Sequence, residues 1–244
     1  MNDVEISIIL PVFNGADILR QSLEKLRVWI SARTYSVELI VVNDCSSDSS
    51  LEILEQFRDK LDYYKIISLP QNRGKGFAVR AGMKSAKGAC VVFTDTDLSY
   101  GAEIFDEMYK FMKANQKISL LYGSRAHPQS QGYSGYTKTR RLSSLLFSNL
   151  VRFAVLPDVK DTQCGVKMFR KNFSELASEK LTVDRFAFDI ELFVIARAHG
   201  LTYQDFPVAL KHREETSVRL IRDAIAMFKD IFRIKINARL GRYK

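Results

Sequence analysis

The stretch Cys90-Val91-Val92-Phe93-Thr94-Asp95-Thr96-Asp97 decides the fold. Its first five residues are apolar or β-branched, which predicts a buried strand of a parallel sheet. Two aspartates separated by one residue follow this strand. In open α/β sheets ligands bind just beyond the carboxyl ends of the strands, and carboxylate oxygens suit Mg²⁺ or Mn²⁺. Asp-x-Asp is also common in turns and helix caps, so it is the position at a strand end that makes Asp95 and Asp97 candidate metal ligands.

Strand and helix patterns alternate on both sides of this stretch. The other expected strands cover residues 5–12, 37–42, 64–69, 118–123, 166–169 and 201–210. Helices are expected at 18–30, 51–57, 77–85, 102–112, 142–155, 188–198 and 217–240. Short-range alternation of this kind predicts an α/β fold with a largely parallel sheet flanked by helices. The alternation becomes irregular after residue 123, where a polar segment through residue 141 is expected to be a mobile loop. We expect one domain over residues 1–240.

The charge of the chain is concentrated at its C-terminal end. The 244 residues carry a net charge of +9, and residues 211–244 contain ten Lys/Arg and four Asp/Glu, a local charge of +6. Such a segment indicates an anionic partner: a membrane surface, a nucleic acid or a phosphorylated substrate. In the expected final helix, apolar residues such as Ile225, Phe228 and Phe232 recur at helical spacing among basic ones. This pattern predicts peripheral contact with a membrane, and its alternatives are packing on the sheet or a homodimer interface.

Cysteine usage and the absence of long apolar runs bear on the compartment. Cys45, Cys90 and Cys164 are odd in number and lack Cys-x-x-Cys spacing, so neither a disulfide framework nor a zinc site is indicated. The first residues do not form a signal peptide, and no stretch reaches the roughly 18 apolar residues of a membrane span. We therefore expect a cytoplasmic protein that does not cross the bilayer.

Several kinds of phosphate site are excluded by their motifs. The first strand leads into Phe13-Asn14-Gly15-Ala16, which is not the Gly-x-Gly-x-x-Gly of a dinucleotide-binding fold, and no P-loop occurs. What remains is a set of residues at strand ends: Pro11 and Phe13, then Asp44, then the two aspartates. A carboxylate such as Asp44 can accept hydrogen bonds from a base edge or a ribose hydroxyl, and a metal ion would neutralise a diphosphate. Together they predict a nucleotide diphosphate lying across the sheet.

At this point the sequence resembles the family 2 glycosyltransferases of the GT-A fold. Within the family it is similar to the polyprenyl-phosphate sugar transferases of the dolichyl-phosphate glucosyltransferase and dolichol-phosphate mannose synthase type. The matching segments, among them Asn72-Arg73-Gly74-Lys75-Gly76 and Asp161-Thr162-Gln163-Cys164-Gly165, lie at residues 8–14, 42–48, 72–82, 94–97, 123–125, 161–167 and 186–192.

The resemblance implies an activity and a set of roles. It implies inverting transfer of a sugar, with UDP-glucose favoured, to a polyprenyl phosphate, at the inner face of a membrane. Residues 1–124 would bind the donor, residues 125–216 the acceptor, and residues 217–240 would form the basic helix. The implied donor-binding residues are Pro11, Phe13, Asp44, Lys75, Asp95 and Arg213. Asp95 and Asp97 would hold Mg²⁺ or Mn²⁺, Asp97 and Asp161 would be catalytic, and Arg125, Arg140 and Arg141 would bind the acceptor phosphate.

The sequence departs from the family pattern at two points in particular. Gly15 stands where relatives often have glutamate, and Val218 follows Ser217 where a basic residue is common, so donor contacts there are open. After Asp97, the relatives' third oxygen ligand would have to come from Ser99 or water.

Two other functions remain as alternatives. A hydroxyl acceptor would require a carboxylate base, for which Asp189 or Glu191 is a candidate. A phosphate acceptor is already anionic at neutral pH and needs arginines instead of a base. A nucleic-acid-binding module would interleave aromatic and basic residues, whereas Phe228 and Phe232 follow the apolar stripe. A nucleotidyltransferase would need a glycine-rich, arginine-containing first loop, which this chain lacks. Because Phe228 and Phe232 follow the apolar stripe, we expect no nucleic-acid partner.

Overall fold

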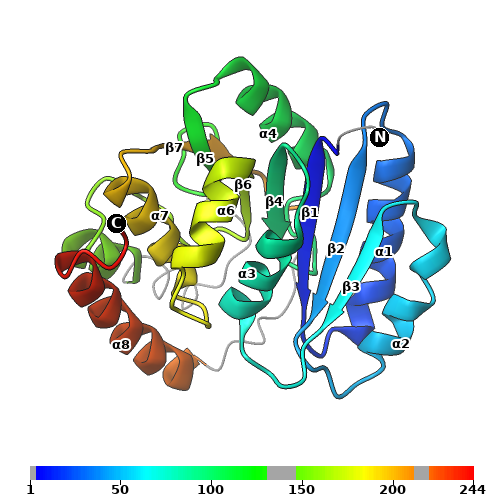
Figure 1. Cartoon of the computed structure of the whole chain (residues 1–244), viewed down its shortest axis with the longest axis horizontal. Coiled ribbons are helices and arrows are strands. Elements are labelled where there is room, and N and C mark those ends of the chain that lie inside the picture. The colour runs from blue at the N-terminus through cyan, green and yellow to red at the C-terminus, as the bar shows by residue number, and fades with distance from the viewer. Residues whose placement is uncertain (1–3, 131–146, 212–219) are drawn as a thin grey trace.

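A seven-stranded sheet forms the centre of the computed structural model, which describes residues 4–130, 147–211 and 220–244 (Figure 1). Its strands are β1 Ile6–Val12, β2 Val37–Asn43, β3 Tyr64–Ser68, β4 Cys90–Thr94, β5 Ile118–Ser124, β6 Val166–Arg170 and β7 Thr202–Pro207. The order across the sheet is β3-β2-β1-β4-β6-β5-β7. Strand β6 runs antiparallel to β4 and β5, and the other neighbouring pairs are parallel. The predicted largely parallel sheet is confirmed.

Helices cover both faces of this sheet (Figure 1). They are α1 Ala16–Ser31, α2 Ser50–Glu55, α3 Lys75–Ser85, α4 Glu103–Ala114, α6 Lys171–Lys180, α7 Phe188–Ala198 and α8 Leu220–Arg239, with a 3₁₀ turn at Arg58–Lys60 and a helical segment at 147–154. Helices α1, α2 and α4 pack on one face, while α3, α6 and α7 pack on the other. The flanking helices predicted from the sequence are therefore present.

The apolar character of the central strands follows from this double cover. Ile8 and Leu10 of β1 point into the core beneath α1 and α4, and Ile9 points into the core beneath α3. Successive side chains of a strand face opposite sides of the sheet, so both sets must be apolar when both faces are buried. This is why β1, β2 and β4 are mostly apolar on both faces instead of alternating, with Ser7 and Glu38 as polar exceptions that are hydrogen-bonded to each other.

One helix was not predicted from the sequence. Helix α6 has four buried positions, and two of them, Ser174 and Ser178, are serines. Its apolar periodicity is therefore too weak to distinguish it from a polar loop. The antiparallel direction of β6 was also not anticipated, because strand direction depends on the path of the preceding chain and not on strand composition.

The predicted apolar stripe of α8 is divided between two faces. Ile231 and Ile234 are buried against the core beneath α7, whereas Phe228, Phe232, Ile236 and Leu240 are between 46% and 62% exposed. The sequence treated these apolar residues as one set, and the structure divides them between a face packed on the core and an exposed face; the predicted membrane contact stays a prediction. The predicted start at residue 217 lies outside the described residues. No helix within the described part of the chain is long and apolar enough to cross a membrane.

Candidate functional site

Three adjacent strands bring most of the predicted donor-site residues to one edge of the sheet. Strands β2, β1 and β4 are neighbours and end at Asn43, Val12 and Thr94. The turns that follow them are bonded to one another: Asp44 N–H donates to the Val12 carbonyl at 2.8 Å, and Thr96 Oγ1 donates to the Pro11 carbonyl at 2.8 Å. Pro11, Asp44 and the Asp95–Asp97 turn thus form a continuous edge, and the exposed Phe13 side chain lies next to it.

Backbone strain is concentrated in the same three turns. Among the described residues other than glycine, a positive φ occurs at Asn14 (48°), Cys45 (59°) and Leu98 (48°). These residues follow β1, β2 and β4 respectively. A left-handed backbone conformation costs about 1–2 kcal/mol for a residue other than glycine, and such residues cluster at functional sites. The clustering is a second, independent reason to treat these turns as the candidate functional site.

Asp95 forms an ion pair with Lys75, the first residue of α3. Lys75 Nζ lies 2.5 Å from Asp95 Oδ1. Burial of Lys75 would lower the pKa of its ammonium group, but the charges of Asp95, Asp189 and Asp97 together with the hydrogen bond to Asp95 outweigh burial and raise that pKa. The lysine is therefore a permanent positive charge at the carboxylate edge.

Gly165 leaves Asp95 the room that it needs. The Asp95 N–H donates to the Gly165 carbonyl at 3.2 Å, and a Cβ built on Gly165 would lie 2.0 Å from Asp95 Oδ2. Such an approach is impossible for any residue with a side chain. Gly165 lies within the family-like segment 161–167. Its role, however, depends on its close approach to Asp95, which the sequence alone did not reveal.

Asp97 is held by the residue two positions further on. Its Oδ1 accepts the Ser99 N–H at 3.0 Å, and its Oδ2 accepts the Ser99 hydroxyl. The turn is closed by the Leu98 N–H, which donates to the Asp95 carbonyl at 3.0 Å. Two carboxylates on one tight turn fit a divalent ion that shares its remaining positions with water and substrate phosphates, because Mg²⁺ is typically held by one or two carboxylates. Ser99 contributes here by orienting Asp97.

Asp44 organises the loop that precedes α3. The Asp44 carboxylate is buried and accepts the N–H groups of Arg73 and Gly74, each at 2.7 Å, and the Asn72 side-chain amide at 3.0 Å. Gly74 has a φ of 102°, a value that only glycine adopts readily. These three hydrogen bonds fill most of the roughly four acceptor positions of a carboxylate. Through them Asp44 fixes the Asn72–Gly74 turn next to the predicted base and ribose site.

Arg125 and Asp161 form a buried pair. Arg125 Nε and Nη2 lie 2.7 Å from the two oxygens of Asp161, and the Arg125 N–H donates to the same carboxylate at 2.9 Å. Burial would raise the pKa of Asp161, but the charge and hydrogen bonds of Arg125 outweigh it and lower that pKa. The geometry holds the guanidinium in one orientation, and it leaves Asp161 charged.

The two candidate bases of the hydroxyl-acceptor alternative are buried and occupied. Asp189 is bonded to Lys167, which has no exposed side-chain surface. Glu191 accepts hydrogen bonds from the Thr182 hydroxyl at 2.6 Å, from the Val183 N–H at 2.8 Å and from the Tyr243 hydroxyl at 2.6 Å. A general base must reach the proton that it removes. Their burial therefore counts against either residue acting as that base.

The remaining predicted residues fall outside the described part of the chain. Arg140, Arg141 and Arg213 belong to residues 131–146 and 212–219, as do Ser217 and Val218, so their predicted roles stay predictions. The part of the predicted loop beyond residue 130 also lies outside the described residues. Lys167 and Gly165 were missed as site residues because each acts through a partner distant in sequence.

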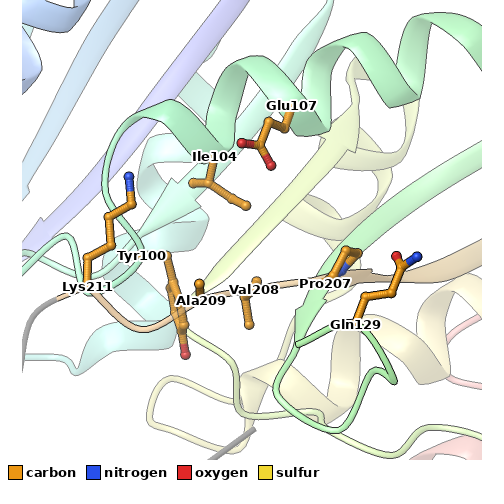
Figure 2. A pocket seen from close by; sticks show the side chains of 8 residues that line it. All are labelled: Tyr100, Ile104, Glu107, Gln129, Pro207, Val208, Ala209 and Lys211. Atoms are coloured by element: carbon orange, nitrogen blue, oxygen red, sulfur yellow. The ribbon is translucent and has the colours of Figure 1, made fainter. Parts of the chain in front are cut away.

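A separate pocket lies between α4 and the segment after β7. Figure 2 shows Ile104 and Glu107 projecting from α4 toward residues 207–211, with Tyr100, Gln129 and Lys211 completing its wall. Of the individually predicted site residues that the structure describes, none lines it, although Gln129 and residues 207–211 belong to the predicted acceptor half. Lys211 Nζ is paired with Glu103 at 2.7 Å, so the basic group beside the pocket is already neutralised.

The fold and the strand-end carboxylates define a glycosyltransferase of the GT-A type. The pattern described as Glycosyl transferase family 2 matches residues 7–176, more than half of the chain, and the chain belongs to this family. A dolichyl-phosphate beta-glucosyltransferase of Trichomonas vaginalis is 29% identical over 98% of this chain and 73% of its own length. The enzyme of the same name from Homo sapiens is 27% identical over 98% of this chain and 78% of its own.

Solved structures have the same fold. Glucosyl-3-phosphoglycerate synthase of Mycobacterium tuberculosis, in complex with UDP, has a TM-score of 0.69 at 17% identity and covers 96% of this chain and 80% of its own. TarS of S. aureus, residues 1–349, has a TM-score of 0.62 at 20% identity and covers 96% of this chain and 65% of its own. At these identities the likeness shows the fold alone.

Proposed function

We propose that this enzyme transfers glucose from UDP-glucose to a polyprenyl phosphate with inversion at the anomeric carbon. The observation that carries the proposal is the relation along almost the whole chain to proteins named dolichyl-phosphate beta-glucosyltransferase. The site supports it, because Asp161, Asp189 and Glu191 are all buried in hydrogen bonds or ion pairs. An acceptor that is already an anion needs no base, and a phosphomonoester is largely ionised at neutral pH.

The reaction follows from this choice of acceptor. An oxygen of the lipid phosphate attacks the anomeric carbon and forms the new C–O bond, while the bond from that carbon to the β-phosphate breaks and its electron pair leaves with UDP. Pro11, Phe13 and Asp44 border the site of the nucleoside. Arg125 is assigned to the acceptor phosphate through its guanidinium charge, which Asp161 holds in one orientation through Nε and Nη2. Arg140 and Arg141 are proposed for the same phosphate, and Arg213 for the donor diphosphate.

A divalent cation belongs to this proposal. Structures of the Mycobacterium tuberculosis enzyme contain Mn²⁺ or Mg²⁺ together with UDP. In this chain Asp95 and Asp97 would hold such an ion, which when bound stabilises negative charge on the departing diphosphate. In this proposal, residues 1–124 bind the donor, residues 125–216 bind the acceptor, and residues 217–240 face the membrane.

We propose that α8 lies on a bilayer that carries the lipid acceptor. Its exposed side presents Phe228, Phe232, Ile236 and Leu240, and residues four apart share one face of a helix. Lys229, Arg233 and Arg239 are exposed on the same helix. Apolar side chains enter the interface while basic side chains attract anionic headgroups, which is the behaviour of interfacial amphipathic helices. The enzyme would then act at the cytoplasmic face, and a homodimer formed through α8 is the competing outcome.

The activity assay separates the possible acceptors. Purified enzyme is incubated with Mn²⁺ or Mg²⁺, a panel of UDP- and GDP-sugars, and either undecaprenyl phosphate or undecaprenol, which lacks the phosphate. We expect a glucosyl phospholipid, detected by mass spectrometry, from UDP-glucose and the phosphate only. Transfer to undecaprenol or to a saccharide hydroxyl would contradict the proposal. Salt-sensitive binding of nucleic acid without any transfer would support the non-enzymatic alternative.

A further inference from the structure

A line of alternating charges runs from the donor edge into the core. Lys75 Nζ is 2.5 Å from Asp95, Asp189 lies within electrostatic range of Lys75, and Lys167 is bonded to Asp189 and, at 3.0 Å, to the Cys164 carbonyl. Side-chain exposure falls along this line from 41% for Asp95 to 19% for Lys75, 5% for Asp189 and none for Lys167. The outer end of the line is thus a candidate metal ligand, and its inner end is a fully buried ammonium group.

Aromatic rings enclose the two ammonium groups. Lys75 Nζ lies 5.5 Å from the centre of the Phe93 ring and 6.0 Å from that of Phe188, and Lys167 Nζ lies 5.2 Å from that of Phe93. Rings at these distances attract cations and exclude water. Buried charges of this kind are often no more stabilising than apolar residues of the same size. A role in the reaction accounts for such a costly arrangement better than stability does.

The ion pair on Asp95 competes with a metal ion. Asp95 Oδ1 is taken by Lys75, and Oδ2 lies against the backbone of Gly165. A divalent ion and an ammonium group on the same oxygen would repel each other strongly at such short range. Binding of a cation between Asp95 and Asp97 therefore requires the Lys75 ammonium to move away. Its flexible four-carbon stem allows this movement, in which the ion pair with Asp95 is the contact that breaks.

We propose that Lys75 has two positions: it neutralises Asp95 in the nucleotide-free enzyme and moves to the donor diphosphate when the cation enters. The proposal rests on the proposed function and deepens it. Asp189, itself held by Lys167, keeps the Lys75 ammonium close to the site in both positions. The exchange leaves the cation site weak until a donor arrives that gives Lys75 a new partner.

The test is Mn²⁺ binding in the absence of nucleotide, measured from the free-ion signal in electron paramagnetic resonance. Lys75→Met removes the competing charge, so Mn²⁺ should bind about tenfold more tightly, which corresponds to about 1.4 kcal/mol. With Mn²⁺ present, UDP should bind the same variant about tenfold more weakly, because the diphosphate loses its ammonium partner. Opposite changes in the two affinities are not expected from a merely structural role.

Two controls accompany this variant. Lys75→Arg keeps the charge, so its Mn²⁺ affinity should stay close to that of the unmodified enzyme. Lys84→Met removes an exposed lysine from the same helix and should change neither affinity. If Lys75→Met does not fold, Lys75→Gln carries the same expectation, since it also removes the charge.

An Mn²⁺ affinity that is unchanged or weaker in the folded charge-removing variant would overturn the two-position proposal. That result leaves the proposed function standing if UDP-glucose and polyprenyl phosphate still react. Conversely, tighter Mn²⁺ binding without any lipid glucosylation would remove the proposed acceptor and leave the competition at Asp95 intact.

Discussion

Individual carboxylates after the strands determine whether this site can bind a donor diphosphate. Asp97 lies on a tight turn with both oxygens oriented by Ser99, and Asp95 is balanced by Lys75. Each contact fixes a charge where a diphosphate would be bound, and electrostatic stabilisation of a leaving group is commonly the largest part of catalysis. Changes of one or two atoms at these positions should therefore have large effects on transfer and small effects on folding.

Asp97→Asn removes one charge and keeps the shape of the side chain. We expect sugar transfer to fall by at least about 10²-fold, the usual loss when one electrostatic contact to a transition state is removed. The midpoint of thermal unfolding should stay near that of the unmodified protein, because the amide oxygen can still accept the Ser99 N–H and the amide NH2 can donate to the Ser99 hydroxyl oxygen. Transfer is measured as labelled glucosyl phospholipid and folding by circular dichroism. Retained transfer would exclude Asp97 from the mechanism.

Gly165→Ala places a methyl group against Asp95. The new Cβ would lie 2.0 Å from Asp95 Oδ2, so the carboxylate must move. We expect Mn²⁺ affinity in the presence of UDP to fall by about tenfold or more, measured by calorimetry. Gly200→Ala is a suitable control, because its φ of 64° makes the substitution strained while no atom lies near the added Cβ. Equal Mn²⁺ affinity in both variants would show that Gly165 does not position Asp95.

Because of Asp161, we expect the free energy of unfolding to decrease as the pH falls through the acid range. Its pKa is lowered in the folded protein, because the charge and hydrogen bonds of Arg125 outweigh the effect of burial. Its contribution is therefore fully present above the usual aspartate pKa of about 4 and is lost as the pH falls toward the lowered value. In Asp161→Asn the free energy of unfolding, measured in urea, should depend less steeply on pH below about 4. A residual slope is expected from Asp48 and Asp158, whose pKa values are also lowered. An unchanged slope would contradict this account of the pair.

At the level of elements, the sequence was informative wherever local pattern determines structure. Strands such as β1 and β4 were predicted because both of their faces are buried, and α1 because four of its five buried residues are apolar at helical spacing. Helix α6 escaped prediction because serines occupy two of its four buried positions. Strand β6 was predicted, but its antiparallel direction was not, because that direction depends on the path of the preceding chain. Pattern predicts an element well when burial and polarity agree, and poorly when they do not.

The last residues of the chain are fastened to α7. The buried Tyr243 donates its hydroxyl hydrogen to Glu191 at 2.6 Å, and the Tyr243 carbonyl lies 2.7 Å from His199 Nε2. Tyr243→Phe removes one hydrogen bond to a charged group and should reduce the free energy of unfolding by roughly 1.5–3 kcal/mol. Urea denaturation measures this loss. Tyr63→Phe, at an exposed tyrosine, should change it by less than about 0.5 kcal/mol. Equal effects would show that the C-terminal anchor does not contribute to stability.

At the scale of the whole molecule, the carboxyl edge of the sheet and the exposed side of α8 are the two surfaces that the proposal requires. The first was predicted from the sequence because strand ends and their aspartates are local features. Its buried support was not predicted, since the contacts of Lys167 with Asp189 and of Gly165 with Asp95 join residues far apart in the chain. The same limit applies to α8, whose two apolar sets could be separated only once α7 was in place.

Phe232→Glu places a charge in the middle of the exposed apolar side of α8. Its side chain is 59% exposed, so the change should leave folding intact. We expect co-sedimentation with vesicles containing phosphatidylglycerol to fall by at least about tenfold, because an apolar ring is lost and like charges are brought together. Leu51→Glu, on α2 and away from α8, should bind vesicles like the unmodified enzyme. Unchanged vesicle binding by Phe232→Glu would remove α8 from the membrane contact, and a shift from dimer to monomer would assign the surface to a second copy of the chain.

The central claim is that the two aspartates after β4 hold a divalent ion against the diphosphate of a sugar nucleotide. A crystal structure of the enzyme with UDP and Mn²⁺ tests it most directly. We predict the ion between the β-phosphate and the carboxylates of Asp95 and Asp97, with Lys75 displaced from Asp95. An ion and nucleotide bound with both carboxylates directed away from them would contradict the claim.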